Sequence, residues 1–386
     1  MQIRKTYKYR LFKSEDNKHL HHSINVAGLM WNYCIAFQKR YRRLFGGYVS
    51  LSAIQARLKK RRNSQRYAFW RALGSQAMQD VAERVHKAYK KLFSGQGGVP
   101  RFKKVKKYKS FTLKKTAGWA LGEDTHHRGT KKNPRCRGHV KILGRWYKFV
   151  KSREIVGEIK TVTVKRDAEG NLWICFSVET ERLIEKRTST GESGGFDFGL
   201  KTFLTDHNGK TYLHPQFFKA GLDRIRVLSR SVSRKQPGSK NRRKAKRLLA
   251  RAHRRIADKR REFHFLLARE LCEDFDAIYI EDLNIEGMKR LWGRKVSDLA
   301  FSQFVKILEH TGEKFDVPVK KIGRYQRTTQ KCSSCGHQQT LSLSERTFAC
   351  ENEDCGLVLD RDHNAAINIL KVGSSTYGRG DVSPSA

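Results

Sequence analysis

Four cysteines near the carboxyl end of the chain have the spacing of a metal site. Cys332 and Cys335 form a Cys-x-x-Cys pair, and Cys350 and Cys355 form a second pair with four residues between them. Two such pairs can bring four thiolates to the corners of a tetrahedron, the geometry that zinc prefers in a structural site. Disulfides or four buried thiols are the alternatives, but no signal peptide opens the sequence, and disulfides are rare in the reducing cytoplasm that we therefore expect. The spacing predicts one structural Zn²⁺, although the second pair is wider than the usual gap.

Three acidic residues are candidates for a second, catalytic metal site. Asp197 lies between two phenylalanines in an apolar strand, Glu281 ends a second apolar strand, and Asp362 opens a short helix. A carboxylate within an apolar strand is unfavourable unless a cation meets it. Three converging carboxylates would repel one another unless hard cations bridged them, and two Mg²⁺ ions about 4 Å apart would also activate a water for phosphodiester hydrolysis. Taken alone, Asp362 is more typical of a solvated helix N-cap.

Two neighbouring acids are weaker candidates. Strand alternation turns Asp282 to the opposite face from Glu281. Asp360 precedes Asp362 by two residues, and we expect it to position the loop there. The predicted magnesium ligands are therefore Asp197, Glu281 and Asp362.

The composition indicates a polyanionic partner. The chain carries a formal charge of +44 over 386 residues, with an isoelectric point near 10.3. Such an excess makes a compact protein repel itself unless a polyanion offsets it, and nucleic acid is the natural candidate. A basic peripheral membrane protein is the alternative, but no apolar run approaches about 20 residues and the basic stretches lack an apolar face. We therefore expect nucleic-acid partners and no membrane partner.

The first half of the chain predicts strands around a block of helices. Residues 1–13 alternate as a strand, residues 16–94 have the helical period of about four helices, and residues 138–180 alternate as two hairpins. We expect these strands to close into a small antiparallel β-barrel with the helices inserted. Residues 119–137 are expected to be irregular.

Two segments of this half are candidate nucleic-acid contacts. A basic stretch after Gly95 interleaves aromatic residues with lysines, which suits a strand that holds phosphates and stacks on bases. One predicted helix carries two glutamines, whose amides could read base edges. The candidates are Gln76, Gln79, Arg101, Lys103, Lys104, Lys107, Tyr108 and Lys109.

The second half predicts a mixed sheet interrupted by a basic helical hairpin. Residues 221–270 form this hairpin, with a turn at KQPGSKN. A solvated hairpin is the alternative, but few acids balance its charge, which favours a phosphate-binding face. Its candidate contacts are Arg242, Arg243, Lys244, Arg247, Arg251 and Arg254.

Several motifs together resemble the TnpB family of transposon-encoded proteins, whose split RuvC nuclease and zinc ribbon are related to type V CRISPR effectors. They are GFDFGL, YIEDLNIEGM, CSSCG and DRDHNAAINIL, and GVPRFKKVKKYKSFT, REIVGEIKTVTV and KQPGSKNRRKA extend the resemblance to nearly the whole chain. Asp197, Glu281 and Asp362 fall on the catalytic positions of that family.

The resemblance implies an α+β multidomain fold. A β-barrel wedge domain (1–15 and 96–186) would contain a helical recognition subdomain (16–95). An RNase H-like nuclease domain (187–325 and 359–372) would follow, with the zinc ribbon (326–358) inserted and a disordered tail (373–386).

The resemblance also implies the activity: RNA-guided cleavage of double-stranded DNA beside a short adjacent motif, in a prokaryotic cytoplasm. The guide RNA would come from the transposon end, with one protein chain per RNA. Two alternatives remain. One is a transposase that catalyses strand transfer itself, for which the sequence shows no nucleophilic Tyr or Ser motif. The other is a guided DNA-binding repressor without cleavage, which the three retained acids argue against.

Overall fold

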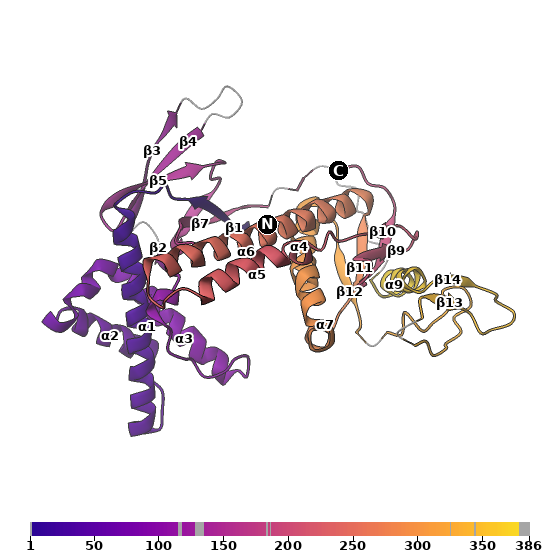
Figure 1. Cartoon of the computed structure of the whole chain (residues 1–386), viewed down its shortest axis with the longest axis horizontal. Coiled ribbons are helices and arrows are strands. Elements are labelled where there is room, and N and C mark those ends of the chain that lie inside the picture. Colours follow the sequence, from indigo (N-terminus) through magenta and orange to yellow (C-terminus); the bar gives the residue numbers. More distant parts are fainter. Residues whose placement is uncertain are drawn as a thin grey trace. The chain divides into compact units, whose positions relative to one another are not determined.

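The chain separates into two structural units, Met1–Arg182 and Leu183–Ala386 (Figure 1). The computed structural model describes residues 2–114, 118–127, 135–182, 184–185, 187–324, 326–342 and 345–377. No helix in these described ranges is both long and apolar enough to span a membrane.

The first unit contains the helices that the sequence period predicts. They are α1 (Asn17–Phe45), α2 (Leu51–Arg62), the 3-10 helix η1 (Gln65–Leu73) and α3 (Ser75–Phe93). Apolar residues at helical spacing on α1 and α3, such as Ile24, Ala27, Val81 and Val85, are fully buried in one core. The basic residues are left on the outer faces.

The strands of this unit form two antiparallel sheets. One has the order β1-β7-β6-β2 and the other the order β3-β4-β5. The strands are β1 (Gln2–Arg10), β2 (Ser110–Lys114), β3 (Trp119–His127), β4 (Arg135–Ile142), β5 (Arg145–Lys151), β6 (Glu158–Arg166) and β7 (Leu172–Glu181). Both predicted hairpins are present, and β1 finds its partner in β7.

The predicted β-barrel is wrong, because among the described residues both sheets are open. Side chains of α3 satisfy the outer edge of β2 where a barrel would need another strand. Asp80 Oδ2 accepts from the Thr112 N–H at 3.0 Å, and Arg84 Nη1 donates to the Ser110 carbonyl at 2.8 Å. The irregular structure predicted for residues 119–137 is also wrong where this stretch is described, since β3 fills its first part and β4 begins at Arg135; residues 128–134 lie outside the described residues.

The second unit is built on a five-stranded sheet of order β10-β9-β8-β11-β12. Its strands are β8 (Ser193–Asp197), β9 (Leu204–Asp206), β10 (Thr211–Tyr212), β11 (Ala277–Glu281) and β12 (Val319–Ile322). Strand β11 runs parallel to both β8 and β12, whereas β9 is antiparallel to β8. The side-by-side placement of β8 and β11 brings together two strands that are far apart in sequence.

Helices cover both faces of this sheet. On one face an apolar core joins Phe196, Ile278 and Ile280 to α6 (Lys240–Asp274) and α8 (Phe301–Phe315). The opposite face packs on α9 (Arg361–Tyr377). Helix α9 contradicts the disordered tail predicted from residue 373, because it continues to Tyr377; residues 378–386 lie outside the described residues.

The remaining elements complete the second unit. The predicted basic hairpin is present as α5 (Leu222–Ser233) and α6, which lie side by side (Figure 1). The other helices are α4 (Phe217–Ala220) and α7 (Ile285–Leu299), and a short ribbon of β13 (Thr347–Ala349) and β14 (Val358–Asp360) precedes α9.

Candidate active site and metal centre

The two strand carboxylates lie on neighbouring parallel strands. Ile280 of β11 pairs with Phe196 of β8, so the next step along the two strands brings Glu281 beside Asp197. Because side chains alternate along a strand and Phe196 faces the apolar core, Asp197 faces the side on which α9 packs. The Asp197 side chain is buried there, with 6% of the residue exposed.

Helix α9 supplies the third carboxylate. Its first turn carries Asp362, and Asp360 caps the helix by accepting from the Asp362 N–H at 2.9 Å and the His363 N–H at 3.3 Å. Close packing on β8 is possible because Gly195 has no side chain: a Cβ there would lie 2.4 Å from the Ala366 carbonyl oxygen. The helix start is thereby held at the ends of β8 and β11.

The ionisation of Asp197 responds to the other two carboxylates. Burial raises the pKa of Asp197 to about 8, and the nearby charges of Asp362 and Glu281 contribute to the rise. Burial also raises the pKa of Glu281, against a hydrogen bond from Thr328 that lowers it. Two arginines lie near Asp362, with Arg361 Nε at 3.6 Å and Arg346 Nη1 at 4.0 Å from its oxygens.

The two neighbouring acids play other parts. Asp282, one residue beyond the end of β11, is half-buried and accepts from Arg324 Nη2 at 2.7 Å. Asp360 serves as the helix cap described above, which agrees with the predicted role in positioning the loop.

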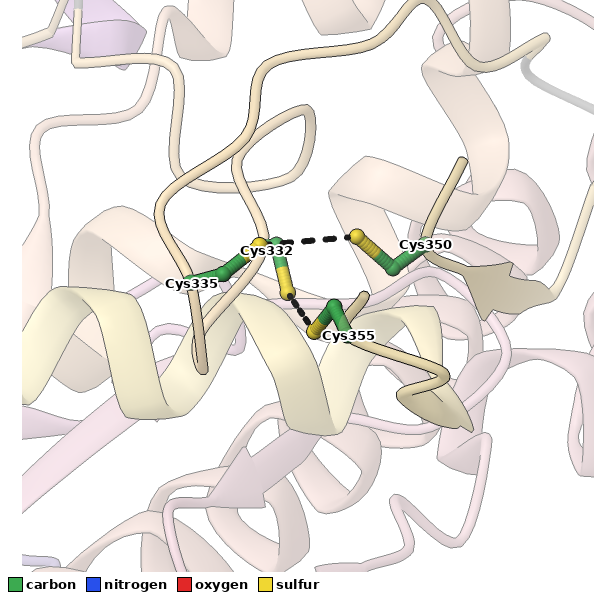
Figure 2. Close-up of side chains that lie close together, drawn as sticks. All are labelled: Cys332, Cys335, Cys350 and Cys355. Carbon is green, nitrogen blue, oxygen red and sulfur yellow. Dashed lines mark hydrogen bonds between the residues drawn. The ribbon is translucent and has the colours of Figure 1, made fainter. Parts of the chain in front are cut away.

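The four cysteines converge on one point (Figure 2). The Cys332 and Cys355 sulfurs are 3.7 Å apart, and those of Cys335 and Cys350 are 3.6 Å apart. Their ligand atoms all lie within 4.8 Å of one another, and within the described ranges these cysteines are the one such group of three or more potential metal ligands. The surroundings of the thiols differ, since a backbone hydrogen bond from His337 is the largest influence that lowers the pKa of Cys335, whereas burial raises the pKa of Cys350.

Two asparagines dock the first cysteine pair onto α9. Asn364 accepts from the Ser333 N–H and donates to the Lys331 carbonyl, both at 2.8 Å. Asn368, one turn later, donates to the carbonyls of Lys331 at 2.6 Å and Thr328 at 2.9 Å. Both side chains are buried, so the sulfur cluster is linked through hydrogen bonds to the helix that carries Asp362.

Sequence reasoning missed these positioning residues. Asn364 and Asn368 have the i, i+4 spacing of one helix face, and a buried polar pair at that spacing was an available signal. Thr328 had no such signal, because its contact with Glu281 depends on the loop before the cysteines.

The basic segment after Gly95 is not a strand over most of its length. It is irregular apart from the short 3-10 helix η2 (Val105–Lys107), and β2 begins only at Ser110. Its cations Arg101, Lys103, Lys104, Lys107 and Lys109 are exposed. The stacking expected of Tyr108 is wrong for this structure, because the ring is 4% exposed and packs beside Trp31.

The two candidate glutamines lie in the first turns of α3. Gln79 is exposed and Gln76 is half-buried. Gln79 lines a cavity of about 510 Å³ between α2 and α3, together with Gln55, Lys59 and Arg62. This groove combines amides with cations.

Most of the candidate arginines and lysines of α6 are exposed, with two half-buried exceptions. Arg242 is half-buried, and its Nη1 donates to the Lys235 carbonyl at 3.0 Å, which fixes the hairpin turn. Arg254 is half-buried and lies 3.7 Å from Asp258. Arg243, Lys244, Arg247 and Arg251 point outward on the helix.

Two family models match the chain. One, described as "Probable transposase", matches residues 173–291, and one described as "Cas12f1-like, TNB domain" matches residues 301–369. A Streptomyces pristinaespiralis protein named "Putative RNA-guided DNA endonuclease" is 28% identical and covers 98% of this chain and 92% of its own length.

A TnpB-like protein of Acanthamoeba polyphaga mimivirus is 32% identical over 58% of this chain and 46% of its own length. Among solved structures, that of a Cas12f1–sgRNA–target DNA complex resembles this fold with a TM-score of 0.58 at 16% identity, covering 95% of this chain and 98% of that chain.

Proposed function

We propose that this chain, which belongs to the TnpB family, is a transposon-encoded RNA-guided DNA endonuclease. A guide RNA derived from the transposon end would direct cleavage of double-stranded DNA beside a short adjacent motif. The observation that carries the proposal is the placement of Asp197, Glu281 and Asp362 at the ends of β8 and β11 and the start of α9, where the charges of the other two raise the pKa of Asp197.

The three carboxylates suit divalent cations. They form an all-oxygen donor set of the kind that Mg²⁺ binds, and the raised pKa of Asp197 reflects its burial and then the neighbouring negative charges, which a cation would offset. Magnesium bound there would supply activation of water and stabilisation of the leaving oxygen of a phosphodiester. The chain itself contributes the orientation of its ligands: Thr328 hydrogen-bonds Glu281, and Asp360 fixes the turn that presents Asp362.

We assign one structural Zn²⁺ to the cysteine cluster. Four thiols whose sulfurs approach within 4.8 Å match a closed tetrahedral site, which leaves no position for a substrate. The proposed role is mechanical: the metal would fix the first cysteine pair, and Asn364 and Asn368 would transmit that order to α9. Each of these contacts lies within the second unit.

The surface charge supports nucleic-acid partners. The outward cations of α6 and of residues 101–109 have few acidic neighbours, so RNA or DNA phosphates would offset them. We propose the helical region of the first unit as the reader of the adjacent motif, with Gln79 as one reading residue.

A cleavage assay tests the function. The full-length protein, purified with its RNA, is incubated in Mg²⁺ with a plasmid that carries the sequence matching that RNA. Cleavage within the matched sequence supports the endonuclease. Guided binding without cleavage would identify a repressor instead, and joining of DNA ends would identify a transposase.

A further inference from the structure

The first unit contains a basic cavity that combines lysines of residues 101–109 with cations of α3. It has a volume of about 550 Å³ and lies between α1, α3 and residues 103–110. Six cations and no acid line it. They are Arg84, Lys87, Lys91, Lys103, Lys107 and Lys109.

Five of the six charges have no acidic partner. Arg84 is paired with Asp80 at 2.9 Å and also bonds the backbone and side chains of β2, so its guanidinium is already engaged. Among the described residues, none of the five lysines forms an ion pair. Gathered cations without counter-charges repel one another, and an anion would offset that repulsion.

Lys103 is held inside the cavity by an aromatic ring. Its Nζ lies 3.7 Å from the centre of the Trp31 ring, whose Nε1 donates to the Arg101 carbonyl at 3.1 Å. Burial, and then the charge of Arg84, lowers the pKa of Lys103. The ammonium is thus fixed in place before any ligand arrives.

A buried hydroxyl completes the donor set. Tyr108 lines the cavity and is 4% exposed; its hydroxyl makes no hydrogen bond of ordinary geometry within the described ranges, although the Arg84 guanidinium lies close to it. An unpaired buried hydroxyl costs free energy, so a bound acceptor is its natural complement. A phosphate oxygen accepts from both hydroxyl and ammonium donors.

We infer that this cavity binds one phosphodiester of a nucleic-acid strand, with Tyr108 as hydroxyl donor and Lys91 and Lys103 as charged donors. Base identity plays no part, because no amide or carboxylate side chain lines the cavity. The inference rests on the proposed nucleic-acid function, but it concerns a separate site in the first unit.

The test compares two adjacent lysines of α3. Lys91 lines the cavity, whereas Lys90 is exposed and does not. Binding of the full-length protein to a mixed-sequence single strand, as RNA and as DNA in separate titrations, is measured over a range of salt concentrations. With RNA, with DNA or with both, Lys91→Gln should flatten the slope of log binding constant against log salt concentration by roughly 0.7–0.9. Lys90→Gln should leave that slope unchanged.

Tyr108→Phe supplies an independent readout. It should weaken binding about threefold to tenfold without changing the salt slope, because a hydrogen bond is lost but no charge. The thermal midpoint of the free protein should stay level or rise, since the unpaired hydroxyl is gone. A purely structural tyrosine hydroxyl would lower that midpoint and leave binding unchanged, which overturns the inference.

The inference would also be overturned if the Lys91→Gln and Lys90→Gln variants had equal salt slopes with both RNA and DNA. Guided plasmid cleavage is scored in parallel for the same variants. If the wild type cleaves but the Lys91 and Tyr108 variants bind like the wild type, the phosphate site is refuted and the nuclease proposal stands. If these variants show the expected binding changes but the wild type does not cleave, the nuclease proposal is refuted and the phosphate site stands.

Discussion

Asn364 accepts a hydrogen bond from the Ser333 N–H at 2.8 Å, one residue after the first cysteine of the cluster. Asp362, two residues before Asn364, opens the same helix. The sulfur cluster and the third carboxylate are therefore connected by a buried amide and half a helical turn.

Replacing Asn364 by Ala should slow DNA cleavage roughly tenfold, in the range found for residues that position metal ligands. The substitution leaves the Ser333 N–H and Lys331 carbonyl unpaired and loosens α9 from the cysteines. Ser375→Ala, at an exposed position on the same helix, is the control and should cleave at the wild-type rate. Single-turnover cleavage rates decide between them, and equal rates would show that the docking does not position Asp362.

Glu281→Gln should abolish cleavage and retain guided DNA binding, because it removes a proposed metal ligand while keeping the side-chain shape. Asp282→Asn changes the adjacent half-buried acid, which pairs with Arg324, and should retain most of the activity. Asp197→Asn and Asp362→Asn should behave like Glu281→Gln. Paired binding and cleavage assays measure this, with Ca²⁺ expected to support binding without turnover. An active Glu281→Gln enzyme would remove that residue from the site.

Cys332→Ser or Cys350→Ser should lose one zinc per chain and make residues 326–358 sensitive to protease. Elemental analysis and limited proteolysis are the measurements. Cys175→Ser, at a half-buried cysteine outside the cluster, should keep its zinc. A wild-type protein purified without zinc would contradict the assignment.

The outward charges of α6 should contact phosphates without reading bases. Changing Arg243, Lys244, Lys246 and Arg247 to Gln should lower the log–log salt slope by about 3, since each lost phosphate contact removes roughly 0.7–0.9. Gln79→Ala should instead change which flanking motif is accepted, measured with a randomised flanking library. If the α6 variant alters the preferred flank, or the Gln79 variant only flattens the slope, the two assignments are reversed.

Asp276 should make folding stability sensitive to acid. Burial raises its pKa, but hydrogen bonds from Ser189, Arg187 and the backbone N–H groups of Thr190 and Gly191 outweigh burial and hold the pKa at about 2. A lowered folded-state pKa stabilises the protein above the unfolded pKa near 4, and that stability is lost as pH falls from 4 to 2.

Asp276→Asn should therefore cost about 3 kcal/mol at pH 7, where Arg187 loses its buried partner. Urea denaturation of both proteins at several pH values checks this. The difference should shrink as pH falls towards 2, and a constant difference would show that the carboxylate charge is not involved.

The parts of the fold that sequence predicts are those encoded locally. The apolar neighbours of Asp197 and Glu281 mark buried strands, and the turn around Asp167 joins a hairpin whose strands alternate. The β-barrel was wrong because closure depends on how Asp80 and Arg84 of α3 meet the edge of β2, which no local pattern records. Strand β3 was missed because its sequence, WALGEDTHH, has few strand-forming residues.

The candidate site, like the fold, could be predicted only where the signal is local in the sequence. The candidate carboxylates and cysteines can be recognised from residue type and spacing. The residues that orient them are defined by tertiary contacts, which the sequence does not show. Thr328 reaches Glu281 from a loop 47 positions later in the chain, and Tyr108 became a core residue because Trp31 packs beside it.

Reprogramming the guide tests the central proposal most directly. The RNA that co-purifies with the protein is sequenced, its guide segment is replaced by a new sequence, and cleavage is mapped on a plasmid carrying both targets in Mg²⁺. The account predicts that the cut moves to the new target and disappears in the Asp197→Asn variant. Cleavage that stays at the old target, or that persists in Asp197→Asn, would contradict it.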